Sequence, residues 1–142
     1  MTRTYTTGIR HGSLLTLTLM VLPLDPPVHS QENPAFEIVV EEAVIATGVD
    51  NLTPIAPSTT FDADVGKLYC FTRIRSSVPS TSIKHLWFHG DKMVMEITLP
   101  VKSTHWRTYS TKTILPSANG NWKVDVTSED GTILKTLDFT IR

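Results

Sequence analysis

Short stretches rich in apolar and β-branched residues recur along the chain after residue 35, with turn-forming residues between them. They occupy residues 36–46, 67–75, 82–89, 92–101, 105–115, 121–128 and 132–141. Several alternate between apolar and polar positions, as strands with one buried face do. The dipeptides Gly90-Asp91, Asn119-Gly120 and Asp130-Gly131 separate some of them and supply the positive φ that tight hairpins need. Because no sustained 3.6-residue period appears after the first thirty residues, the pattern predicts an all-β fold.

About seven short strands with hairpin chemistry predict an immunoglobulin-like antiparallel β-sandwich. A small closed β-barrel is the alternative. Residues 47–66 are rich in Thr, Pro and Asp and are expected to form a long polar connection. Cys70 is the single cysteine, so it can form no disulfide within the chain, and its apolar neighbours predict a buried structural thiol.

The first thirty residues have the pattern of a secretory signal peptide. Arg3 and Arg10 precede an apolar run at residues 14–22, and small residues follow near Ser30. The run is far shorter than the roughly 20 residues of a membrane-spanning helix. We expect cleavage near Ser30, a secreted or periplasmic product and a single domain of residues 31–142, with no membrane span in the mature chain. An uncleaved interfacial anchor is the alternative.

The charge of this mature chain is close to balanced. Of the 13 basic and 14 acidic side chains, Arg3, Arg10 and Asp25 lie in the leader, which leaves 11 and 13 and a net charge of −2. Neither sign forms a long run, which argues against nucleic acid as a partner, because phosphate binding needs a basic patch. The chain has no Gly-rich phosphate loop, Cys-x-x-Cys or His-Glu-x-x-His motif, so no cofactor or metal is expected.

The stretch KHLWFHG at residues 84–90 places His85, Trp87 and His89 on one side of a strand. The two histidines would be about 13 Å apart, too far to share a zinc ion. If Gly90-Asp91 forms a two-residue turn, His85 lies opposite Glu96. That pair is either a structural cross-strand contact or a proton-sensitive site in which the carboxylate raises the histidine pKa.

This register divides the hairpin into an apolar face and a semi-polar face. The semi-polar face carries His85, Trp87 and Glu96. A three-residue loop would reverse the faces and bury Trp87. The first register is favoured because Gly-Asp suits a type II′ turn. It assigns to the core Leu86, Phe88, Met93, Met95, Ile97 and Leu99.

A second group of aromatic and basic residues lies in HWRTYS, residues 105–110. Arg107 is next to Trp106 and two residues from Tyr109, which lies on its own side of the strand. Such an arginine can stack on aromatic rings or clamp a carboxylate, or it can lock two strands through backbone carbonyls. The candidate ligand- or partner-binding residues are therefore His85, Trp87, Glu96, Trp106, Arg107 and Tyr109. Trp122 is in phase with Val124 and Val126 and is expected in the core.

One series of residues resembles a known family. It comprises His85-x-Trp87, Trp106-Arg107-Thr108-x-Ser110, Gly120-x-Trp122-x-Val124, and Asp130-Gly131 with Leu134 and Phe139. The chain is similar in this series to the bacterial domain of unknown function 2914, over roughly residues 40–142. The resemblance implies a compact β-rich module, often fused to membrane or envelope segments, with no established activity, cofactor or catalytic residue.

We interpret the chain as a non-catalytic binding module of the bacterial cell envelope whose partner is an envelope protein or a glycan. One alternative is a carbohydrate-binding module that uses Trp87, Trp106 and Tyr109. A hydrolase is the other. It has weak support, because the chain lacks a nucleophile-elbow motif and residues 105 and 110 of a strand point to opposite faces.

Overall fold

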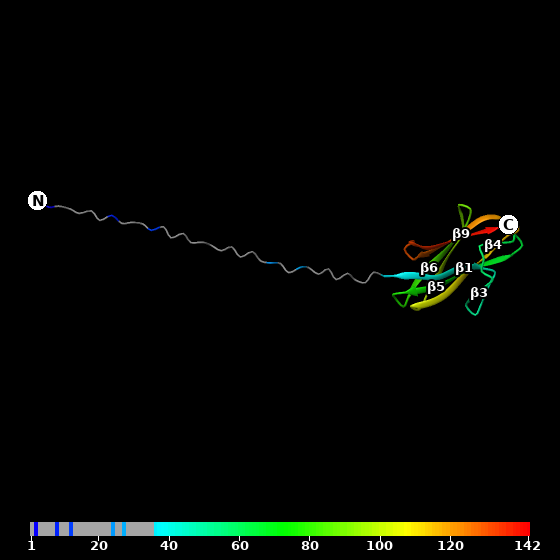
Figure 1. Cartoon of the computed structure of the whole chain (residues 1–142), viewed down its shortest axis with the longest axis horizontal. Coiled ribbons are helices and arrows are strands. Elements are labelled where there is room, and N and C mark those ends of the chain that lie inside the picture. The colour runs from blue at the N-terminus through cyan, green and yellow to red at the C-terminus, as the bar shows by residue number, and fades with distance from the viewer. Residues whose placement is uncertain (1, 3–7, 9–11, 13–23, 25–26, 28–35) are drawn as a thin grey trace. The chain divides into compact units, whose positions relative to one another are not determined.

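The computed structural model describes residues 2, 8, 12, 24, 27 and 36–142, and every strand lies in the last segment (Figure 1). The expected signal peptide and its cleavage position near Ser30 therefore lie, apart from five isolated residues, outside the described residues. Among the described residues no helix has the length and hydropathy needed to cross a membrane. The strands are β1 (Ile38–Ala46), β2 (Gly48–Asp50), β3 (Thr53–Ile55), β4 (Thr60–Phe61), β5 (Lys67–Ser76), β6 (Thr81–His89), β7 (Lys92–Val101), β8 (His105–Thr113), β9 (Gly120–Ser128) and β10 (Ile133–Ile141).

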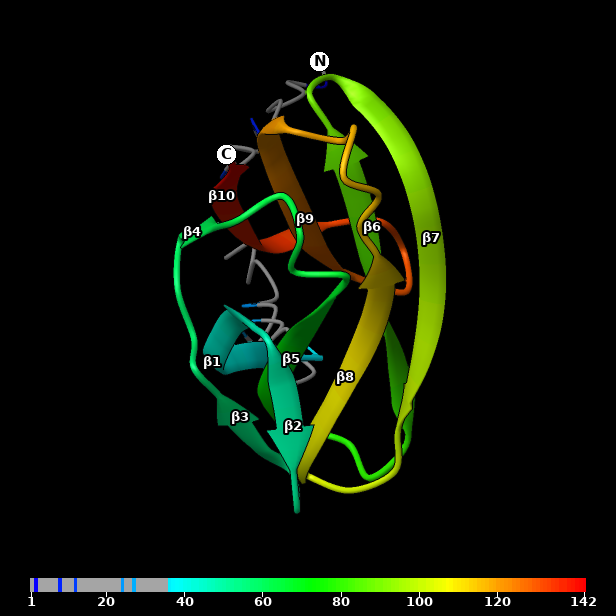
Figure 2. The same ribbon diagram turned by 90° about the vertical axis from the view of Figure 1, so that its right-hand side faces the viewer.

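Two sheets pack face to face. The smaller has the order β1-β5-β8, and the larger has the order β4-β10-β9-β6-β7. All neighbours pair antiparallel except the short β4, which runs parallel to β10. Figure 2 shows β8 in front and β6 and β9 behind it. Neither sheet closes on itself, so the predicted sandwich is confirmed over the barrel alternative.

The strand order is that of an immunoglobulin-like domain. In such domains the second and fifth strands pair in one sheet, while the third, sixth and seventh share the other. Here β5 pairs with β8, and β6, β9 and β10 are neighbours. Trp87 lies on β6, which corresponds to the third strand of an immunoglobulin domain. It is fully buried, as the tryptophan of an immunoglobulin core is. The single Cys70 lies in the same core cluster.

All seven strands predicted from the sequence are present, within two residues of the expected ends. The segment 47–66 is more ordered than expected, because it contains the β2–β3 hairpin and β4. At the tip of that hairpin, Asn51 and Leu52 both have positive φ, 47° and 53°. Asn tolerates this conformation, whereas Leu adopts it at a cost, which hid the turn from the sequence pattern.

Inward-facing side chains of both sheets form two adjoining core clusters. The larger contains Trp87, Trp122 and Phe139, and the smaller contains Ile83 and Val126. Trp122 is 5% exposed and Val124 is fully buried, as predicted. Burial also raises the pKa of the Cys70 thiol well above its usual range, so it stays a neutral packing group, as predicted.

The β6–β7 hairpin has the predicted two-residue turn. Gly90 has a φ of 58°, as the first central residue of a type II′ turn requires. The pairs next to the turn, His89 with Lys92 and Phe88 with Met93, are the predicted ones.

Beyond those pairs the predicted register is wrong. The register shifts at Val94, which has no partner on β6, so that Trp87 pairs with Met95. A β-bulge of this kind inserts one residue into one strand. His85 therefore does not oppose Glu96.

The bulge changes which side chains are buried. Ile83, His85 and Trp87 of β6 point into the sandwich and are fully buried. Leu86 and Phe88, predicted to be core residues, lie on the outer face of the larger sheet. On β7 the core prediction is confirmed for Met95 and Leu99, which pack against the core. It is wrong for Met93, which precedes the bulge, and for Ile97, because both side chains are exposed.

Candidate functional site

A buried hydroxyl joins the two sheets. Ser110 of β8 points across the core to β6, where His85 Nδ1 lies 2.7 Å from Ser110 Oγ. The indole Nε1 of Trp87 donates to the same oxygen at 3.0 Å. Since His85 and Trp87 are both fully buried, these contacts are shielded from solvent.

The groups that can donate a hydrogen determine the direction of each hydrogen bond in this cluster. Thr72 of β5 donates its hydroxyl hydrogen to the Thr108 carbonyl at 3.4 Å, so its oxygen accepts from His85 Nε2–H, also at 3.4 Å. With the proton of the ring on Nε2, Nδ1 accepts from the Ser110 hydroxyl. The chain of donation therefore runs from Trp87 through Ser110, His85 and Thr72 to a backbone carbonyl, and every group in it is satisfied.

This arrangement requires a neutral imidazole. Burial lowers the pKa of His85 from 6.5 to about 4, because the charged form would lose its hydration. A second ring proton on Nδ1 would also displace the Ser110 hydroxyl hydrogen from its acceptor. The pKa change is opposite to the increase expected from a pairing with Glu96.

A histidine bonded to a serine hydroxyl is also the contact between base and nucleophile in hydrolases. Here the second ring nitrogen meets a threonine hydroxyl instead of a carboxylate, and Ser110 is 3% exposed. The arrangement therefore has a structural role: it links the two sheets by hydrogen bonds. The contact between Ser110 and His85 was not predicted from the sequence, in which only the nearby His105 was considered as a partner for Ser110. The sequence signal that could have indicated it is the position of Ser110 on the inward-facing side of its strand.

Glu96 lies apart from this cluster. Its carboxylate is on the outer face of the larger sheet, 3.6 Å from the Lys84 ammonium, and both side chains are partly exposed. Arg107 is on the outer face of the smaller sheet, so the candidate residues His85, Glu96 and Arg107 do not form one site.

The outer face of the smaller sheet carries most of its charge on β1 and β5. Arg73 lies 3.6 Å from Glu41 and 3.5 Å from Glu42, and Arg75 lies 3.4 Å from Glu41. These ion pairs are half-exposed and join β1 to β5. The bulge that places Glu41 outside the regular register lets one carboxylate reach both arginines.

Arg107 differs from these two arginines. It is exposed on β8, directly opposite Arg73, and among the described residues it has no ion pair or side-chain hydrogen bond. It borders a groove of about 570 Å³ together with Glu41, Leu52, Arg73, His105 and Trp106. The groove thus combines a free guanidinium with apolar surface, and the strained Leu52 is part of its wall.

The aromatic residues predicted to form a platform do not share a face. Trp87 is in the core, Trp106 points inward and packs against the smaller core cluster, and Tyr109 points outward with 40% of its surface exposed. Tyr109 instead contacts Tyr69, with ring centroids 5.8 Å apart. The predicted alternation along residues 105–110 is confirmed.

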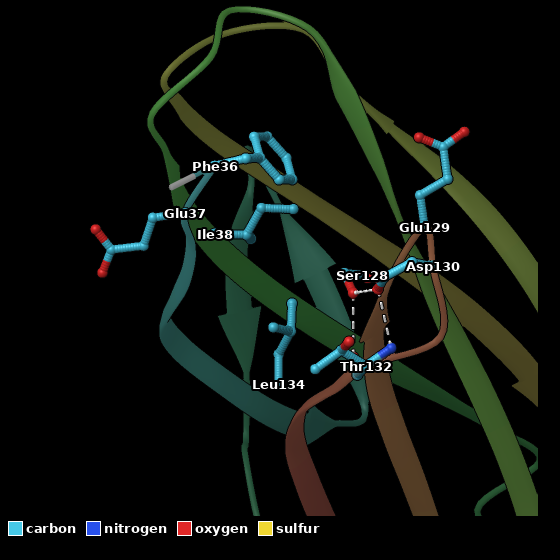
Figure 3. A pocket seen from close by; sticks show the side chains of 8 residues that line it. All are labelled: Phe36, Glu37, Ile38, Ser128, Glu129, Asp130, Thr132 and Leu134. Atoms are coloured by element: carbon cyan, nitrogen blue, oxygen red, sulfur yellow. Dashed lines mark hydrogen bonds between the residues drawn. The ribbon is translucent and has the colours of Figure 1, made fainter. Parts of the chain in front are cut away.

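A second cleft, of about 470 Å³, lies between the start of β1 and the β9–β10 turn (Figure 3). Phe36 and Ile38 face Leu134 across it. Asp130 accepts hydrogen bonds from the Ser128 hydroxyl and from the Thr132 backbone N–H, the latter at 3.1 Å. These bonds lower the pKa of Asp130 and close the turn, so its carboxylate has a local structural task. In the part of the chain that the structure describes, no three His, Cys, Asp or Glu residues are grouped to hold a metal ion.

Comparison with known families gives the segment its classification. Residues 80–141 match the family described as "Protein of unknown function (DUF2914)". Over these residues, called the DUF2914 segment below, the chain is similar to that family. The match is shorter than the expected resemblance over residues 40–142, but it includes every residue on which that resemblance rested, and it extends from the start of β6 almost to the end of the chain.

The DUF2914 segment contributes both core and surface. His85, Trp87, Ser110, Trp122 and Phe139 are buried, and edge-to-face or stacked contacts join Phe139 to the two tryptophans, with ring centroids 6.2 and 6.0 Å away. In the residue series that carries the resemblance, the charged residues are Arg107 and Asp130. Asp130 closes a turn, whereas Arg107 has no such task.

No curated protein matches this chain. Among solved structures, the chain is similar to a GH3 β-glucosidase from Bifidobacterium adolescentis, with 9% sequence identity and a TM-score of 0.42. The alignment covers 75% of this chain and 17% of that enzyme, so the chain spans a small part of its length.

Proposed function

We propose that this DUF2914-containing chain is a non-catalytic interaction module of the bacterial cell envelope, which binds a partner through the groove beside β8. The observation that carries the proposal is Arg107: an exposed guanidinium without a partner among the described residues, at the border of a groove with apolar walls. An arginine of this kind is a frequent anchor for carboxylate groups of a partner.

Two further observations support binding over catalysis. The serine–histidine contact lies in the core, so it offers no accessible nucleophile. The three aromatic residues of the carbohydrate alternative lie on different sides of the smaller sheet or in the core, so they do not present coplanar rings to a sugar.

The proposed location depends on the sequence of the leader. An export signal in residues 1–30 would deliver the β-domain to the periplasm or the medium. To check this, the full chain would be expressed with a C-terminal tag in a bacterial host, the cells fractionated, and the mass of the product measured. We expect a periplasmic or secreted product that begins near Gln31. A cytoplasmic product of full mass would contradict the location.

Binding is tested with two charge-reversal variants of the full chain. Immobilised wild type and Lys135→Glu, which changes an exposed lysine of β10 in the larger sheet, should capture the same protein from an envelope extract. Arg107→Glu, with the same change of charge, should lose it while unfolding at the same temperature. Equal capture by both variants would exclude the β8 groove as the binding site.

A further inference from the structure

The two sheets have four edges, and β8 is the least protected of them. β4 has two residues, and the register of β1 is interrupted at Glu41. β7 has the bulge at Val94 and also contains Pro100, which cannot donate a hydrogen bond. Such features are the usual ways in which proteins block strand addition at an edge. In contrast, β8 forms nine consecutive pairs with β5 without an interruption.

The phase of the backbone along β8 follows from two hydrogen bonds at its ends. Ser76 N donates to Thr104 O, and Ile114 N donates to Gly66 O, both at 2.9 Å. In an antiparallel pair the hydrogen-bonded positions alternate, so even-numbered residues of β8 direct their N–H and C=O groups to β5. Odd-numbered residues direct theirs to the opposite side. They are His105, Arg107, Tyr109, Thr111 and Thr113.

Within residues 36–142 no strand pairs with that second side of β8. The side chains of all five odd-numbered residues are exposed. Backbone N–H and C=O groups along this edge of β8 are therefore available to pair with another strand, beside the Arg107 guanidinium.

The charge of β8 indicates what can occupy this edge. The strand carries His105, Arg107 and Lys112 and no acidic residue. A second copy of the chain that paired through β8 would bring only basic or neutral side chains opposite one another, with no attractive charge pair. An acidic segment would instead place a carboxylate beside Arg107.

We infer that β8 accepts an extended acidic segment of a partner protein as an added strand, with a carboxylate of that segment paired with Arg107. This inference rests on the proposed binding function and specifies its partner. Main-chain hydrogen bonds to the odd-numbered residues would provide affinity, and side chains on alternate faces would provide selectivity. One face of the added strand would meet Arg107 and the groove, and the other would continue the inner side near Trp106.

The probe is a fluorescein-labelled peptide of about nine residues in which glutamate and valine alternate, because successive side chains of a strand point to opposite faces. Its binding to the full chain would be measured by fluorescence anisotropy. One control peptide has lysine in place of each glutamate. The other keeps the sequence but carries N-methyl groups on alternate amides, which removes main-chain donors without changing the charge.

We expect the glutamate peptide to bind and both controls to bind roughly tenfold more weakly or worse, because one repels Arg107 and the other cannot form the ladder. Binding should weaken as salt is raised, since exposed charges are screened.

Variants of the protein separate the contribution of the Arg107 side chain to peptide affinity from the contribution of the β8 backbone. Arg107→Glu should lower the affinity roughly tenfold, whereas Lys135→Glu should leave it unchanged. Thr111→Pro removes an N–H that points away from β5, so the pairing with β5 is preserved. Compared with Thr111→Ala, which keeps that N–H, Thr111→Pro should bind the peptide several-fold more weakly. Circular dichroism and thermal unfolding of each variant verify that the fold is intact.

Equal binding of the N-methylated peptide would overturn strand addition, and so would absence of peptide binding. In either case the capture experiment with Arg107→Glu would still decide whether the groove binds a partner. A concentration-dependent dimer in sedimentation that is lost in Thr111→Pro would show that a second copy occupies the edge, which would also overturn the inference.

Discussion

His85 shows how one buried residue connects hydrogen bonding to proton binding. Its ring lies between a serine that donates to Nδ1 and a threonine that accepts from Nε2, which fixes a single tautomer. A buried polar network stabilises a protein when every member is satisfied and destabilises it when one is not. The neutral ring meets this condition, and the protonated ring does not.

The stability of the domain should therefore depend on pH through His85. The folded pKa of about 4 is below the unfolded value of 6.5, so between these values the unfolded state binds a proton that the folded state excludes. This contribution to stability is fully present above pH 6.5 and declines as the pH falls to about 4. A decrease of up to about 3 kcal/mol in the free energy of unfolding is expected.

Urea unfolding of the wild type and of His85→Gln between pH 7 and 4.5 measures this effect. His85→Gln should be less stable at pH 7 but should lose less stability on acidification. The matched control His105→Gln changes an exposed histidine and should keep the wild-type pH dependence. An identical slope in wild type and His85→Gln would show that His85 binds protons equally in both states.

The residues that could be predicted from the sequence are those whose position depends on local pattern. Trp122 was placed in the core because it is in phase with Val124 on one strand. The common side of Arg107 and Tyr109 followed from the same alternation. The Ser110–His85 contact could not be predicted, since it joins residues 25 positions apart in different sheets and depends on how the two sheets are aligned.

Among the elements, β6 and β7 show where strand patterns are insufficient. The turn at Gly90 was predicted correctly because turn chemistry is local. The bulge at Val94 has no comparable signal, and a shift of one residue transfers every following side chain to the other face. Both sides of this hairpin carry large apolar residues, so the hydrophobic pattern alone could not exclude either register.

The central strand β9 depends on Trp122. Its ring stacks on His89 of β6 with centroids 4.5 Å apart, contacts Phe139 of β10, and its Nε1 donates to the Ala118 carbonyl at 2.9 Å. One side chain thus connects three neighbouring strands and the loop before β9.

Trp122→Ala should lower the free energy of unfolding by about 3–5 kcal/mol, because it leaves a large cavity and an unpaired carbonyl. Chemical denaturation would measure the loss. Tyr109→Ala provides the control: this aromatic is 40% exposed on β8, and its loss should cost much less. A cost below 1 kcal/mol for Trp122→Ala would contradict its role as the link between β6, β9 and β10.

For the whole molecule, the contacts between and within the two sheets predict a domain that folds independently. Both core clusters and the hydrogen-bonded chain through Ser110 consist of residues between Ile38 and Ile141. The last strand, β10, is central to the larger sheet, where it pairs with β9 and with the short β4. Truncation at the C-terminal end would therefore open the core, whereas removal of the leader leaves every described contact within residues 36–142 in place.

Residues 31–142, expressed without the first thirty residues, should accordingly form a folded β-domain. We expect a far-UV circular dichroism spectrum of β type and a single cooperative urea transition with a stability in the usual range of about 5–15 kcal/mol. A second protein that ends at Asp130, and so lacks β10, is the matched control and should be unfolded, because Trp122 and Trp87 lose their contacts with Phe139. An aggregated or non-cooperative 31–142 product would show that the leader contributes to the fold.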